Sequence, residues 1–103
     1  MRFMVKVQWD IDKGNALIRS GKLGPTMEAI LGDLKPEAVY FTTTDGNRSA
    51  YLIVHMDDVA QLPAIAEPWF LAVNAKIDAQ PVMLPEDLAK AGPSIEAAVK
   101  KYA

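Results

Sequence analysis

The residues best suited to chemistry are the single histidine and a few polar and aromatic side chains that the hydrophobic pattern groups with it. His55, Lys6 and Tyr40 are the candidate catalytic residues. A histidine titrates near neutral pH, so His55 could transfer a proton while Lys6 or Tyr40 stabilises a developing oxyanion. The candidate ligand-binding residues are Tyr40, Thr42, Tyr51, His55, Gln8 and Asp78. A few polar groups among aromatic rings are typical of small-molecule pockets.

Each candidate also has an ordinary structural interpretation, which the sequence leaves open. Lys6 and Asp78 could form a simple cross-strand ion pair. His55 could be a hydrogen-bonded residue at a strand end, and the tyrosines could line an interface. With one histidine and no cysteine, the sequence predicts no metal site and no cofactor.

A β-hairpin over residues 37–55 positions most of these side chains. Its strands read as 38–44 and 50–55, and Asp45-Gly46-Asn47-Arg48 forms the turn between them. A loop centred on Gly46-Asn47 pairs Thr44 with Ser49 and Ala38 with His55. Alternation places Val39, Phe41, Thr43, Ala50, Leu52 and Val54 on a core face. The opposite face carries Ala38, Tyr40, Thr42, Tyr51, Ile53 and His55.

The rest of the chain supplies two more strands and the helices that cover the core face. Residues 3–9 and 76–83 alternate as strands, and helical patterns follow from Lys13, from Pro25 and from Val59, the last interrupted by Pro63 and Pro68. Asp10 or Asp12 can cap the first of these helices. The second carries a core-facing stripe of Met27, Ile30, Leu31 and Leu34. The order predicts an α+β, ferredoxin-like βαββαβ fold with a four-stranded antiparallel sheet in the order 4-1-3-2. Two helices cover one face, and residues 1–84 form this unit. Residues 85–103 form a C-terminal helical extension.

The second face of this sheet is neither fully polar nor fully apolar. A solvated antiparallel sheet normally alternates cleanly between apolar and polar residues, whereas Tyr40, Tyr51 and Ile53 all fall on the side away from the helices. We therefore expect a homodimer in which this face is covered. Strand 1 adds Lys6, which we expect near Ile53 and His55 and within reach of Asp78.

Composition narrows the range of partners. The chain has 103 residues, a formal net charge of −2, and 50% hydrophobic residues. Its scattered basic residues argue against a nucleic-acid or anionic-membrane partner. No signal peptide and no transmembrane run is recognisable, so we expect a cytoplasmic protein.

Several segments resemble the dimeric α/β-barrel superfamily of small ferredoxin-like proteins. The opening Met1-Arg2-Phe3-Met4-Val5, the Pro68-Trp69-Phe70 segment and the strand end Pro81-Val82-Met83-Leu84 are similar to muconolactone isomerase. Residues 35–43 and 64–68 are similar to short YCII-like bacterial proteins of this class. The resemblance covers about residues 1–87 and implies a homodimer whose sheets pack face to face. No catalytic motif of these families maps onto this chain, and the resemblance does not make His55 a haem ligand.

Three functions remain open at this point. The first is a homodimeric protein that binds a small organic molecule in a cavity without catalysis. The second is a cofactor-independent isomerase or monooxygenase in which His55 transfers a proton. The third is a purely structural dimer module.

Overall fold

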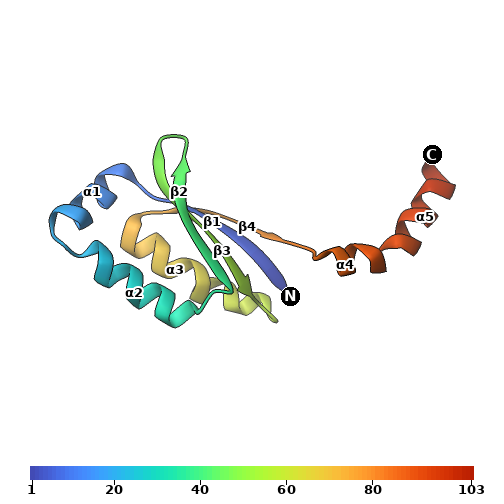
Figure 1. Ribbon diagram of the computed structural model, residues 1–103, viewed down its shortest axis with the longest axis horizontal. Coiled ribbons are helices and arrows are strands. Elements are labelled where there is room, and N and C mark those ends of the chain that lie inside the picture. Colours follow the sequence, from blue (N-terminus) through green and yellow to red (C-terminus); the bar gives the residue numbers. More distant parts are fainter.

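The computed structural model describes residues 1–103 and shows one sheet with helices on one side and a helical arm that projects away (Figure 1). The strands are β1 (Arg2–Gln8), β2 (Ala38–Thr44), β3 (Asn47–His55) and β4 (Lys76–Pro81). The helices are α1 (Ile11–Arg19), α2 (Leu23–Leu34), α3 (Leu62–Val73), α4 (Pro85–Lys90) and α5 (Gly92–Tyr102), and a short 3₁₀ turn, Val59–Gln61, precedes α3.

The sheet has the order β2-β3-β1-β4 and all three pairings are antiparallel. This is the predicted 4-1-3-2 order, so the ferredoxin-like α+β fold is confirmed. Helices α1, α2 and α3 lie on one side of the sheet, and the other side carries no helix (Figure 1). Of the two predicted caps, Asp10 and Asp12, it is Asp10 that caps α1, since its carboxylate accepts a hydrogen bond from Lys13 N at 2.9 Å. Pro68 lies inside α3 without ending it, so the predicted break falls earlier, at the 3₁₀ turn.

The hairpin turn lies one residue earlier than predicted, which shifts the pairing of β2 with β3 by two residues. Asp45 and Gly46 form the turn, with φ of 51° and 78°, and Thr44 pairs with Asn47. Two successive positive φ values are typical of a type I′ turn, whose twist matches that of the strands. The shift places Ala38 opposite Ile53 and Tyr40 opposite Tyr51, but it leaves both predicted faces unchanged.

Replacing Gly46 with Ala should destabilise the fold by about 1–2 kcal/mol, because a Cβ disfavours the left-handed region. Gly32→Ala in α2 is the matched control, since φ there is ordinary and a Cβ meets no atom within 4 Å. The control should be neutral or stabilising, by up to about 1 kcal/mol. Urea unfolding at one fixed protein concentration measures both changes. Equal effects of the two substitutions would contradict the assigned turn.

The core lies between the sheet and the three helices. Its largest fully buried apolar side chains are those of Trp69, Leu52, Val5, Val7 and Val73. The predicted α2 stripe contributes as expected: Met27 and Ile30 are buried, and Leu31 and Leu34 pack against the cluster.

Helix coverage stops short of the hairpin tip. Val39 packs on the core, but Phe41 is 55% exposed and Thr43 is also exposed. The prediction that both residues are core is therefore wrong, although their strand parity is right. The tip extends past the helices in Figure 1, so the helix-facing side of β2 is left open there.

The C-terminal helices form an arm, which we define as residues 83–102. Neither α4 nor α5 contains a buried residue, and together they point away from the sheet (Figure 1). The radius of gyration is 17.3 Å, against ~13 Å for a compact chain of this length. None of the helices has the length and apolar character needed to cross a bilayer.

Candidate functional site

The predicted site residues lie on the open face of the sheet in cross-strand rows. Asp78, Lys6, Tyr51 and Tyr40 form the central row, one residue from each strand in the order β4-β1-β3-β2. Lys6 and Asp78 are opposite one another as predicted, but their charged groups form no ion pair within 4 Å. In this row Tyr40 and Lys6 are separated by the intervening strand that carries Tyr51.

His55 lies outside the central row. Its cross-strand partner on β1 is Arg2, whereas Lys6 pairs with Tyr51, so the expected proximity of His55 to Lys6 is wrong. Four residues of strand separate Tyr51 from His55, or ~13 Å. The three candidate catalytic residues therefore do not share one site in this protomer.

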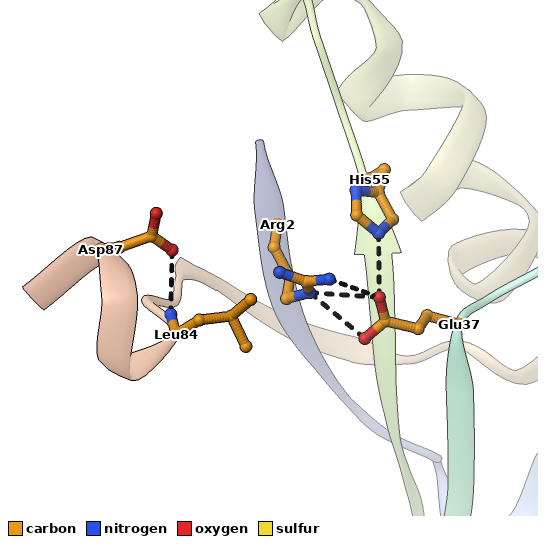
Figure 2. Close-up of polar contacts among 5 residues, drawn as sticks. All are labelled: Arg2, Glu37, His55, Leu84 and Asp87. Atoms are coloured by element: carbon orange, nitrogen blue, oxygen red, sulfur yellow. Dashed lines mark hydrogen bonds and ion pairs between the residues drawn. The ribbon is translucent and has the colours of Figure 1, made fainter.

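Figure 2 shows what His55 contacts instead: Glu37, just before β2, lies between His55 and Arg2. Arg2 Nη2 donates to Glu37 Oε1 at 2.6 Å, and Arg2 Nε lies 3.2 Å from both carboxylate oxygens. His55 Nε2 and Glu37 Oε1 are 3.1 Å apart. An ionised carboxylate can only accept, so His55 Nε2 donates in this bond.

The hydrogen bonds from Arg2 and then from His55 lower the pKa of Glu37 from its ordinary value of 4.5 to about 2. The same contact raises the pKa of the Arg2 guanidinium. Glu37 therefore stays ionised at any pH near neutrality. Arg2 and Glu37 were not predicted as site residues. The only sequence signals for them were the position of Arg2 on the open face of β1 and that of Glu37 at the start of the hairpin.

Acid should dismantle this cluster in a defined window. Because the pKa of Glu37 is lowered in the fold, its stabilising effect is present above about pH 4.5 and is lost as the pH falls toward about 2. Carbon-13 NMR titration of the Glu37 carboxyl should show its midpoint near the lower value. In an Arg2→Gln variant, which loses the main cause, the midpoint should move up toward 4.5. An unchanged midpoint in that variant would show that Arg2 is not the cause.

This cluster can orient an imidazole, but it does not exclude water. Glu37 fixes His55 Nε2 and leaves Nδ1 free for another partner, next to a cavity of about 440 Å³ that also involves Arg2, Met83 and Asp87. The His55 side chain is 55% exposed. The His55 imidazole could therefore transfer a proton. The site is open to water, however, and it is the exclusion of water that strengthens electrostatic interactions in an active site.

A second cavity, of about 590 Å³, lies between α2 and the uncovered part of the hairpin. We call it the α2–hairpin pocket. Its apolar wall is made of Trp9, Leu23, Met27, Leu31 and Phe41. Thr42 is the one predicted ligand-binding residue among its lining residues. Sequence reasoning missed this pocket because Phe41 and Met27 were both assigned to a closed core.

Two polar groups belong to the side chains around this pocket, one at its border and one buried within its wall. Arg48 borders it, and its guanidinium Nη2 donates to Asn15 Oδ1 at 2.9 Å. Gly14 on α1 makes room for Arg48, because a Cβ there would lie 2.9 Å from Arg48 Nη1. The Trp9 indole Nε1 is buried and has no hydrogen-bond partner. The pocket is thus mostly apolar with a few fixed polar groups, the usual composition of a small-molecule site.

The remaining predicted residues lie apart from both cavities. Gln8 borders a shallow polar hollow of about 390 Å³ at the start of α1, together with Asp10, Asp12 and Lys76. Asp78 borders a hollow between β4 and α3. No group of three or more His, Asp or Glu side chains is close enough together to hold a metal ion.

Two of the solved structures that are similar to this chain illustrate the comparison. The de novo designed protein Ferredog-Diesel is 11% identical, covers 79% of this chain and 85% of its own, and has a TM-score of 0.43. An ACT domain protein from Streptococcus pneumoniae is 24% identical, covers 81% of this chain and 96% of its own, and has a TM-score of 0.42. None of the curated proteins matches the chain.

The family comparison covers nearly the whole chain. A family model described as a domain of unknown function, DUF3303, matches residues 1–95. The resemblance to muconolactone isomerase and the YCII-like proteins stays a prediction, since this match does not test it. The matched residues extend through β4 and α4 into the first part of α5. The chain therefore belongs to the DUF3303 family.

Proposed function

We propose that the protein is a homodimeric binding module for a small, largely apolar organic molecule held in the α2–hairpin pocket. The observation that carries the proposal is the pocket itself, about 590 Å³ in volume and walled by apolar side chains. Ligand pockets are typically 300–1,000 Å³, mainly apolar, and carry a small number of orienting polar groups. Arg48 is suited to that orienting role, because Asn15 already holds its guanidinium in place.

The binding role is favoured over catalysis by the position of His55. His55 and Glu37 are at the opposite end of β3 from Arg48 and Ser49, which border the pocket. A molecule in the pocket would therefore lie out of reach of the His55 imidazole. The homodimer is proposed because the open face retains Tyr40, Tyr51 and Ile53 without a covering element in the protomer.

A fluorescence titration tests the binding role directly. Anilinonaphthalene sulfonate, an apolar dye with one anionic group, should bind with an emission increase and quench Trp9, whose indole forms part of the wall. A thermal-shift screen of small aromatic acids and ketones should then yield compounds that displace the dye. If the folded protein does not bind the dye, the proposed binding role is wrong.

A further inference from the structure

The arm carries an apolar stripe that nothing in the protomer covers. Ile95, Val99 and Tyr102 lie on one face of α5, at spacings of four and three residues, and are 51%, 56% and 78% exposed. Leu88 continues the apolar side chains onto α4 and is also exposed. A regular amphipathic stripe of this kind is typical of a helix packed against another surface.

The two helices of the arm are too short to be stable in water without packing against another surface. α5 has 11 residues and α4 has 6, whereas isolated helices shorter than ~12–15 residues are marginal in water. In proteins, packing of the apolar face supplies the missing stability. Since the sheet and its helices offer α5 no contact, the packing surface has to come from elsewhere.

The route of the chain directs the arm away from its own sheet. Val82 N still donates to Arg2 O at 3.0 Å, so pairing with β1 continues to residue 82. Only Met83 and Leu84 remain before Pro85 begins α4. A residue before proline disfavours the helical region, and Leu84 is extended, with φ −77° and ψ 161°. The arm therefore leaves the sheet beyond the end of β4 and leads away from its own open face (Figure 1).

The open face of a second copy has the right dimensions for the arm. α5, with 11 residues, spans ~17 Å at 1.5 Å per residue, and seven-residue strands span ~23 Å. A helix is ~10 Å wide and therefore covers about two strands spaced ~4.8 Å apart. The central strands β1 and β3 present Met4, Ile53 and Tyr51 there, and all three are only half-buried in the protomer.

Charge favours an arm over direct stacking of two sheet faces. In a two-fold stack each face meets itself, so residues near the axis meet their own copies. Lys6 lies in the central row, so a stack whose axis passes through Lys6 would bring two such ammonium groups together. An α5 stripe brings only apolar side chains to the same place.

We propose that the arm is exchanged: residues 83–102 of each protomer cross to a second copy and pack the Leu88, Ile95, Val99 and Tyr102 stripe on its open sheet face. This inference rests on the proposed homodimer and identifies the element that covers the face. The two crossing segments, Val82 to Leu84, then lie beside each other near the two-fold axis.

The test compares two substitutions on the same helix in the full chain. Ile95→Asp places a carboxylate in the stripe, whereas Ala97→Asp places it about 160° away, on the far side of α5. Ala97→Asp costs more in helix propensity than Ile95→Asp, because Ala is the better helix former, so propensity alone would weaken the control more than the stripe variant. Sedimentation equilibrium should show the unsubstituted chain and Ala97→Asp as dimers. The dimer of Ile95→Asp should be at least tenfold weaker.

Cross-linking then identifies which protomer the arm contacts. The chain has no cysteine, so Val99→Cys and Lys6→Cys variants each carry one thiol. A flexible bis-maleimide should link the two variants into a species of twice the chain mass when they are mixed. A double variant cross-linked within single chains would show the arm on its own face and overturn the proposal.

The outcomes separate this inference from the proposed homodimer. A dimer that survives Ile95→Asp unchanged overturns the arm exchange and leaves the sheet-face dimer standing. A monomeric unsubstituted chain overturns both. A dimer lost only in Ile95→Asp, together with cross-chain linkage, supports the exchange.

Discussion

An Ile53→Asp variant should be monomeric at protein concentrations at which the unsubstituted chain is a dimer. Ile53 lies on β3 between Met4 on β1 and Ala38 on β2, in the apolar row of the open face. If a second copy covers this row, a carboxylate there has to be desolvated without a partner. Central interface positions commonly cost 2 kcal/mol or more when disrupted, so we expect dissociation to be about 30-fold easier or more.

Thr43→Asp is the matched control for this experiment. Thr43 is exposed on β2 of the same hairpin but belongs to the opposite face. Both variants add the same charge to a strand of the same sheet, and only Ile53→Asp should change the sedimentation mass. Amide hydrogen exchange should show that the β1–β3 pairing survives in both. A fully dimeric Ile53→Asp protein would mean that the open face is not the interface.

The fold could be predicted because its signals are local. The alternation in β1 and β4 and the Met27, Ile30, Leu31, Leu34 stripe each occur within one short segment, and the order of such segments defines the ferredoxin-like plan. Caps such as Asp10 are equally local. None of these required knowledge of which distant residues meet.

The candidate site depended on register, which is a long-range property. A shift of two residues keeps every side chain on its predicted face, so hydrophobic alternation could not distinguish the Asp45–Gly46 turn from one centred a residue later. Likewise, placing β1 against β3 by direction alone brought Lys6 near His55, whereas the observed pairing puts Arg2 there. Face membership was therefore predictable, and the neighbours of His55 were not.

The α2–hairpin pocket was out of reach for a related reason. Phe41 carries the sequence signature of a core residue, and its strand parity does point it toward the helices. The exposure of Phe41 depends on where α2 begins relative to the hairpin tip. The position of that first turn is set by how the helix packs across the sheet. How deeply a side chain is buried depends on tertiary packing. The correct assignment of Phe41 to the helix-facing side of β2 therefore did not imply that a helix covers it.

A Glu28→Trp variant should lose at least tenfold in affinity for anilinonaphthalene sulfonate. Glu28 lies on α2 at the margin of the pocket and is exposed. An indole at this position can fold over the apolar wall formed by Met27 and Leu31, and a ligand then has to displace it. Tenfold corresponds to about 1.4 kcal/mol, less than the apolar area of a tryptophan can supply.

Asp33→Trp distinguishes pocket occlusion from a general effect of the substitution. Asp33 is also an exposed acidic residue of α2, but it does not border the pocket. Both variants lose one negative charge and gain one indole, so dye binding by Asp33→Trp should match that of the unsubstituted chain. If both variants bind the dye as before, the dye occupies another surface, such as the arm stripe. Because the pocket lies on the helix side of the sheet, Glu28→Trp should also leave the sedimentation mass unchanged, which separates loss of ligand binding from loss of the dimer.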